Sequence, residues 1–168
     1  MKKTIIRLAL CLIGLLPTMP ISADTWENHR EALDYEGKGS LIDPIVISTP
    51  GQLAEFSHMV NEGRHPDGMV AVLANDIDLT ATDGDQRRSW VPIGTMANPY
   101  RGLFLGFNPN EEGWEKREPH AIRGLYCSSG SDLSGLFGVS SGFIGFLNVI
   151  DAEINNPDGI SGIVCGIN

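Results

Sequence analysis

The sequence predicts a mainly β protein, a parallel β-solenoid that starts with a capping helix. Three observations predict this fold class. Short apolar segments recur at shifts of 22 and 27 residues, and 13 glycines fall in the 75 residues from Gly94 to Asn168. A helical period occurs in one segment, near the N-terminal end of the chain. Because glycine adopts backbone angles that other residues avoid, a repetitive chain rich in glycine is expected to turn corners between short strands.

Residues 1–23 have the layout of a secretory signal peptide. Lysine and arginine precede an apolar run over residues 8–16, and the segment ends at Ala23, after which cleavage is expected. A membrane anchor is the alternative, but the run is shorter than the roughly 20 residues of a spanning helix. We therefore expect export to the extracellular space, the cell surface or the periplasm, and no transmembrane span in the mature chain.

Charge argues against a nucleic-acid partner. The 168 residues include 12 Lys+Arg and 21 Asp+Glu, a net charge of −9, which becomes −12 without residues 1–23. Phosphate binding requires clustered lysine and arginine, which this chain lacks. At 42% hydrophobic residues, the chain is also too apolar to be simply disordered.

The mature chain divides into three regions. Residues 24–40 are a polar entry segment, residues 41–94 form an N-terminal cap region, and residues 95–168 form early coils of the solenoid. In the cap region a helix is expected over about 50–62, because Ser48 or Thr49 can cap it, proline suits its first turn and glycine follows its end. Its apolar stripe consists of Leu53, Phe56, Met59 and Val60. Extended segments are expected at 45–47, 69–73 and 75–79.

The repeats fill the third region. The segment Arg101-Gly102-Leu103-Phe104 returns after 22 residues as Arg123-Gly124-Leu125-Tyr126, and residues 134–137 return after 27 residues as 161–164. Stacked coils are expected to align such positions in inward-facing ladders. An antiparallel sandwich stays open as an alternative, because it also has short strands and glycine turns. The structural repeat positions are Gly102, Leu103, Gly124, Leu125, Gly135, Leu136, Phe137, Gly138, Leu147 and Gly162.

Several further segments follow one another in a fixed order: Asp43-Pro44, Ile47-Ser48-Thr49-Pro50, Gln52-Leu53-Ala54, Asn75-Asp76-Ile77-Asp78-Leu79, Pro92-Ile93-Gly94, Gly135-Leu136-Phe137-Gly138 and Phe146-Leu147-Asn148-Val149. In this order they resemble the N-terminal part of secreted, adhesin-like bacterial proteins with GLUG motifs. The resemblance covers roughly residues 37–168. It implies a right-handed parallel β-helix on exported or surface proteins, and no catalytic residues, because the motif is structural.

The sequence departs from that pattern in two places. A polar loop over 107–120 looks inserted, and its Trp114 is a candidate ligand contact, the alternative being that this ring folds back onto the coil. Cys165 stands where the repeat has its second glycine, and the last repeat opens without closing. We therefore expect a chain truncated at its C-terminus, the N-terminal fragment of a longer protein.

Residues with the potential for chemistry are few. Asp76 and Asp78 would point to one side of a strand and, with Asp83 and Asp85, offer oxygen ligands for Ca²⁺, but their spacing fits no established calcium loop. We expect a solvated acidic surface there, with no metal, no cofactor and no catalytic residue in the chain. Whether Cys127 and Cys165 form a disulfide or remain two thiols is left open.

The expected function is that of an exported, non-enzymatic surface or adhesion-type binding module, whose partner is a glycan or a host or cell-surface protein. The alternative is a fragment of a carbohydrate-active β-helix enzyme, a polysaccharide lyase or hydrolase. The candidate residues for such an enzyme are Asp76 and Asp78, together with Arg101 and Arg123 if the 22-residue spacing stacks these arginines on one face.

Overall fold

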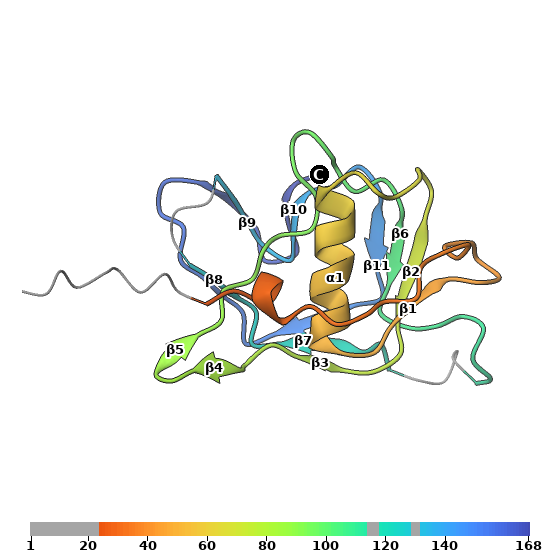
Figure 1. The fold of residues 1–168 in the computed structure, drawn as a ribbon, viewed down its shortest axis with the longest axis horizontal. Coiled ribbons are helices and arrows are strands. Elements are labelled where there is room, and N and C mark those ends of the chain that lie inside the picture. Colours follow the sequence, from red (N-terminus) through yellow and green to blue (C-terminus); the bar gives the residue numbers. More distant parts are fainter. Residues whose placement is uncertain (1–23, 114–117, 129–131) are drawn as a thin grey trace, which may run out of the picture.

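The computed structural model describes residues 24–113, 118–128 and 132–168, and in these residues the fold is mainly β with many short parallel strands. It contains one α-helix there, α1 (Pro50–Asn61), and a short 3-10 helix, η1 (Trp26–His29). In Figure 1, α1 lies in front of the strands.

Helix α1 begins and ends at the residues that local chemistry favours. The Thr49 side chain accepts a hydrogen bond from the Gln52 N–H at 3.2 Å, and Pro50 occupies the first turn, where its missing N–H costs nothing. Gly63, with φ +69°, takes the left-handed conformation that ends the helix. The apolar stripe expected from the sequence is buried, so α1 packs by this face onto the strands.

The largest sheet has four parallel strands in the order β1 (Ile45–Ile47), β2 (Val70–Leu73), β6 (Leu103–Leu105) and β11 (Phe143–Gly145). A three-stranded parallel sheet has the order β12 (Asn148–Ile150), β7 (Ala121–Arg123) and β3 (Ile77–Asp78). Three parallel pairs follow: β8 (Tyr126–Cys127) with β13 (Glu153–Ile154), β9 (Leu133–Ser134) with β14 (Ile160–Ser161), and β10 (Phe137–Val139) with β15 (Cys165–Ile167). The remaining two strands, β4 (Thr82–Asp83) and β5 (Gln86–Arg87), form an antiparallel hairpin.

The chain visits these sheets repeatedly in the same order. One pass runs through β2 and β3 to a bridge between Ile93 and Phe137. The second pass runs from β6 to β10, and the third from β11 to β15. Each strand of the third pass lies beside its counterpart in the second, and in the second pass β6 and β7 lie beside β2 and β3. We call β11 to β15 the open edge, because in the described residues each of these strands pairs on one side alone.

The strand pairing corrects one interpretation of the sequence. Leu133 pairs with Ile160, which confirms the 27-residue shift, whereas the 22-residue shift is not a strand register: Ile144 pairs with Phe104, not with Ile122. The similar sequences around Leu103 and Leu125 lie at different corners of the chain path. Leu125 lies in the main core, but Leu103 packs on the opposite side of the four-stranded sheet, against Val70, Val72 and Leu105.

The loop that looked inserted explains why the spacing varies. Leu103 pairs with a residue 40 positions later, Phe143, whereas Ala121 pairs with Asn148, 27 positions later. Fifteen residues separate β6 from β7, where two separate β11 from β12, so this loop supplies the whole difference.

Glycine is required where passes approach closely. A Cβ on Gly102 would lie 2.0 Å from the Met69 carbonyl oxygen, and one on Gly135, at φ +141°, would lie 2.1 Å from the Gly162 carbonyl oxygen. Both positions belong to the predicted repeat motif, and both glycines allow backbones to lie side by side.

Four aromatic rings form the centre of the core. Phe56 of α1 contacts Tyr100 and Phe104, both with centroids 5.8 Å away, and Phe137 lies 5.4 Å and 5.3 Å from the same two rings. All four side chains are completely buried. The helix and the second pass thus share one apolar cluster.

Candidate functional site

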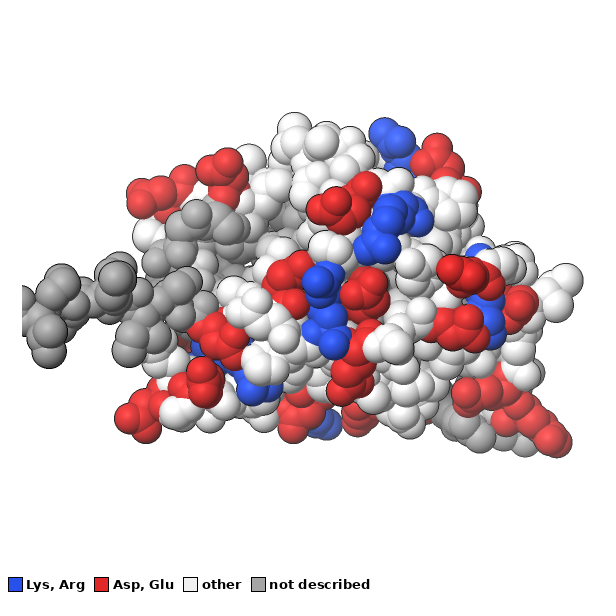
Figure 2. Space-filling view, viewed as in Figure 1, with Lys and Arg blue, Asp and Glu red and all other residues white. Residues whose placement is uncertain are grey.

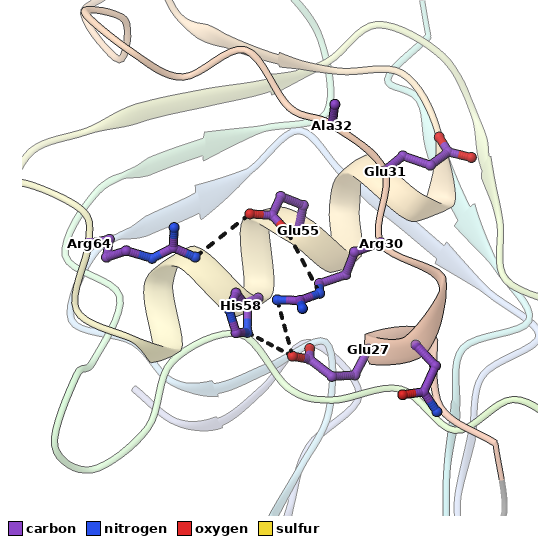
Figure 3. A pocket seen from close by; sticks show the side chains of 8 residues that line it. Glu27, Arg30, Glu31, Ala32, Glu55, His58 and Arg64 are labelled. Atoms are coloured by element: carbon purple, nitrogen blue, oxygen red, sulfur yellow. Dashed lines mark ion pairs between the residues drawn. The ribbon is translucent and has the colours of Figure 1, made fainter.

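A polar cleft of about 650 Å³ lies between η1, the segment after it and the solvent face of α1. We call it the ionic cleft, and Figure 3 shows its lining. The lining residues are Glu27, Asn28, Arg30, Glu31, Ala32, Glu55, His58 and Arg64. Acidic and basic groups alternate over this part of the surface in Figure 2.

The helix positions one side of the cleft. Glu55 and His58 are three residues apart, so they share the face of α1 opposite its buried stripe. The entry segment brings Glu27 and Arg30 to this face, and the chain beyond the helix brings Arg64.

A chain of ion pairs connects these groups. His58 Nδ1 lies 2.7 Å from Glu27 Oε1, and Arg30 Nη1 lies 3.4 Å from the same oxygen. Arg30 Nε and Arg64 Nη2 each lie 3.7 Å from the Glu55 carboxylate. These partly exposed pairs contribute little to stability, on the order of 0–1 kcal/mol each, so a ligand can replace one partner at small cost.

Asp24 fastens the entry segment beside the cleft. Its carboxylate accepts hydrogen bonds from the Asn28 side chain at 3.0 Å and the Arg88 Nε at 3.1 Å, and it lies 2.5 Å from His29 Nε2. The bonds from Asn28 and His29 lower the pKa of Asp24 to about 2. The Asp24 carbonyl also accepts from the Ser89 N–H at 2.9 Å, which joins this segment to the body of the protein.

Charged side chains dominate the lining of the cleft. Among the residues that line it there is no serine, threonine, cysteine or lysine. Ser57 is next to His58 in sequence, but its hydroxyl donates to the Val91 carbonyl at 2.9 Å. The arrangement therefore suits charge-assisted hydrogen bonds to a ligand that carries groups of both signs.

A second hollow, of about 300 Å³, lies beside the hairpin. Its tyrosine ring is already covered, so it does not offer a surface on which a ligand could stack. The Arg87 guanidinium covers the Tyr126 ring at 4.7 Å, and it pairs with Glu153 at 2.8 Å. Since the open face of this ring is already occupied, these contacts hold the hairpin onto β8 and β13.

The acidic residues singled out in the sequence have separate local roles. Asp76 accepts from the Ala121 N–H at 3.0 Å, and this bond is the first cause of its lowered pKa. Asp78 accepts from the Thr80 hydroxyl at 2.6 Å and from the Thr80 N–H at 2.9 Å, and the hydroxyl is the first cause of its lowered pKa. Asp83 and Asp85 belong to the hairpin region. Within the described ranges, no three histidine, cysteine or acidic side chains lie where they could share a metal ion.

The other singled-out residues do not converge either. Arg101 pairs with Asp67 at 3.7 Å, while Arg123 lies in β7 opposite Asp78, so these arginines do not stack on one face. Cys127 and Cys165 are free thiols, and burial raises the pKa of both. Trp114, the candidate ligand contact, lies outside the described residues, as does the signal-peptide segment 1–23.

Sequence reasoning missed the ionic cleft. Glu55 and His58 are three residues apart on the predicted helix, and this spacing could have indicated one wall of the cleft. The other wall depends on how residues 24–40 fold back over α1, and a polar segment without periodicity does not reveal this.

Comparisons of the chain with protein-family models, with curated proteins and with solved structures find no match. In the part of the chain that the structure describes, no helix combines the length and apolar character needed to cross a bilayer.

Proposed function

We propose that this chain is an exported binding module without enzymatic activity, which engages a charged protein surface through the ionic cleft. The observation that carries the proposal is the chain of ion pairs through Glu27, Arg30 and Glu55 to Arg64. Complementary charges on a partner would steer association and fix its orientation. A protein partner is favoured over a glycan because, among the described residues, no phenylalanine, tyrosine or tryptophan lines the cleft to stack on a sugar.

The pairing of the carboxylates favours binding over hydrolysis. A glycosidase requires two carboxyl groups with different roles, one acting as the acid and the other as base or nucleophile. Glu27 and Glu55 instead share one ion-pair partner, Arg30, so the geometry gives them no such division of roles. The ionic cleft therefore gives the enzyme alternative no more support than Asp76 and Asp78 do.

We further propose that the strands build a right-handed parallel β-solenoid of the GLUG-motif, adhesin-like kind, with α1 as its cap. The support is the order in which successive passes visit the sheets, with each strand parallel to its counterpart. Export after cleavage near Ala23 belongs to the same proposal. It is supported by the order of basic residues, apolar run and small residue in residues 1–23.

The cleft is tested by a double substitution that leaves the net charge unchanged. Glu55→Gln with Arg64→Gln removes two members of the ion-pair chain, while Asp67→Asn with Arg101→Gln removes an exposed pair elsewhere and serves as the matched control. The probes are immobilised extracellular-matrix proteins and a glycan array. We expect the cleft variant to weaken protein binding about tenfold or more, equivalent to about 1.4 kcal/mol, and the control to bind as wild type.

Equal binding by both variants would contradict the cleft as the site, and glycan binding lost with the cleft variant would replace the protein partner by a sugar. A turnover assay on acidic polysaccharides addresses the enzyme alternative. Turnover that Asp78→Ala abolishes would overturn the non-enzymatic proposal.

A further inference from the structure

The turn over residues 39–43 exposes two neighbouring apolar side chains. Ile42 is 89% exposed and Leu41 is 59% exposed, and the orange loop that holds this turn extends beyond the strands in Figure 1. The turn directly precedes β1, which lies at the opposite end of the four-stranded sheet from the open edge. Single exposed apolar residues are ordinary, whereas adjoining ones on a rigid turn are typical of contact sites.

Backbone hydrogen bonds hold this turn in one conformation. The N–H groups of Gly39 and Ser40 both donate to the Asp43 carbonyl, at 2.8 Å and 3.1 Å. The Asp43 N–H donates in return to the Ser40 hydroxyl at 3.0 Å. The Val70 N–H of β2 donates to the Gly39 carbonyl at 2.8 Å, so the turn is also fastened to the sheet.

The loop after β6 holds the tip of the turn. The Asn110 side-chain amide donates to the Leu41 carbonyl at 2.9 Å and to the Ile42 carbonyl at 3.3 Å. These bonds engage the backbone of both residues and leave their side chains exposed to solvent. A segment that is already held in place loses less conformational freedom on binding, so a rigid apolar tip is suited to anchor a contact.

Acidic groups surround this tip. Residues 34–43 contain three acidic residues and one lysine, a net charge of −2. The lysine, Lys38, lies 3.1 Å from Asp34 and 3.7 Å from Asp43, and the loop that carries Asn110 adds two further acidic residues, Glu111 and Glu112. A second copy of this acidic chain would meet like charges here, whereas a basic partner would complement them.

We propose that Leu41 and Ile42 anchor the protein to a partner protein, in which an apolar pocket with a basic rim takes up this tip. Ile42 enters the pocket, Leu41 covers its edge, and the carboxylates around the turn pair with the rim. None of residues 39–43 lines the ionic cleft, so the two surfaces are separate and either can fail without the other.

The probe is a β-cyclodextrin whose rim carries ammonium groups, because this ring combines an apolar cavity with a basic rim. Unsubstituted β-cyclodextrin is the uncharged control. Each host is titrated into the purified protein, and binding at the tip is followed by nuclear magnetic resonance from the methyl signals of Leu41. We expect the ammonium host to bind there about threefold or more tighter than the uncharged host.

Three variants separate the tip from the rest of the surface. Ile42→Thr retains the branched shape but adds a hydroxyl, and it should weaken binding of the ammonium host about fivefold or more. Met96→Thr makes the corresponding change at a side chain 72% exposed elsewhere and should leave affinity within about twofold. Asn110→Ala keeps both apolar side chains but removes the bonds to their carbonyls, and it should weaken binding severalfold.

Several outcomes would overturn the proposal. Equal affinity of the two hosts would remove the charge argument, and wild-type affinity in Ile42→Thr or in Asn110→Ala would remove the rigid apolar anchor. Binding to phosphatidylcholine vesicles that Ile42→Thr abolishes would make a membrane the occupant. A concentration-dependent dimer in light scattering that Ile42→Thr dissociates would make it a second copy.

Discussion

At the scale of single residues, Asp24 connects the entry segment to the fold and gives it a pH response. Its pKa of about 2 in the folded protein is below the ordinary value near 3.8, mainly because Asn28 and His29 donate to the carboxylate. A depressed folded-state pKa stabilises the protein above the unfolded pKa, and this contribution disappears as pH falls through the folded value.

We therefore expect Asp24→Asn to be less stable than wild type above about pH 4, with the difference shrinking to nothing near pH 2. Urea unfolding midpoints of both proteins across this range provide the measurement. Other carboxylates act equally in both proteins, so the difference isolates Asp24. A difference that stays constant with pH would show that the carboxylate is not held as described.

The sequence could identify residue types but not their neighbours. Gly102 and Gly135 were predictable as corner residues, and the structure provides the physical reason, a carbonyl oxygen within about 2 Å of any added Cβ. The partner of Glu55 was not predictable, because Arg30 and Arg64 reach it from outside the helix. Long-range ion pairs leave no periodic trace in a sequence.

At the scale of elements, α1 is the segment that local rules predict best. Its cap, its proline, its stripe and its terminal glycine all favour the same structure. The Thr49 hydroxyl has two partners, since it accepts from the Gln52 N–H and donates to the Glu31 carboxylate. The start of the helix is thereby also tied to the segment that forms the wall of the ionic cleft.

Thr49→Ala should lower the free energy of unfolding by about 1 kcal/mol, within the usual range for a lost N-cap. Thr49→Ser keeps the hydroxyl and should remain close to wild type. Chemical denaturation monitored by far-UV circular dichroism compares the three proteins. If serine destabilises as much as alanine, the hydroxyl is not the group that matters.

Strand registers were only partly predictable. The 27-residue shift agrees with the pairing of β9 with β14, whereas the 22-residue shift aligned corners of different sheets. The misalignment has a physical origin: a glycine followed by an apolar residue suits any corner, whichever face the side chain then takes. Leu125 turns into the core and Leu103 away from it, although their surroundings in sequence are nearly the same.

At the scale of the whole molecule, one aromatic cluster joins the helix to the second pass. Phe104 contacts Phe56 of α1 and Phe137 of the second pass, and it has no exposed surface. Removing this ring should leave a cavity that the close-packed neighbours fill only in part.

Phe104→Ala should therefore destabilise the fold by about 3–5 kcal/mol. Met96→Ala, at a largely exposed side chain, should change stability by less than about 0.5 kcal/mol. Denaturant titrations followed by tryptophan fluorescence and by circular dichroism give both values. Coincident transitions are expected because the cluster spans helix and strands, and separate ones would mean that α1 unfolds independently.

The variable length of the passes has a consequence for detection and for redesign. Strand pairing is maintained although counterparts in neighbouring passes lie from 27 to 45 positions apart. A search for one constant repeat length would overlook such an architecture. The connection between β6 and β7 is also a natural graft point, where foreign sequence can be inserted or shortened while the flanking strands keep their partners.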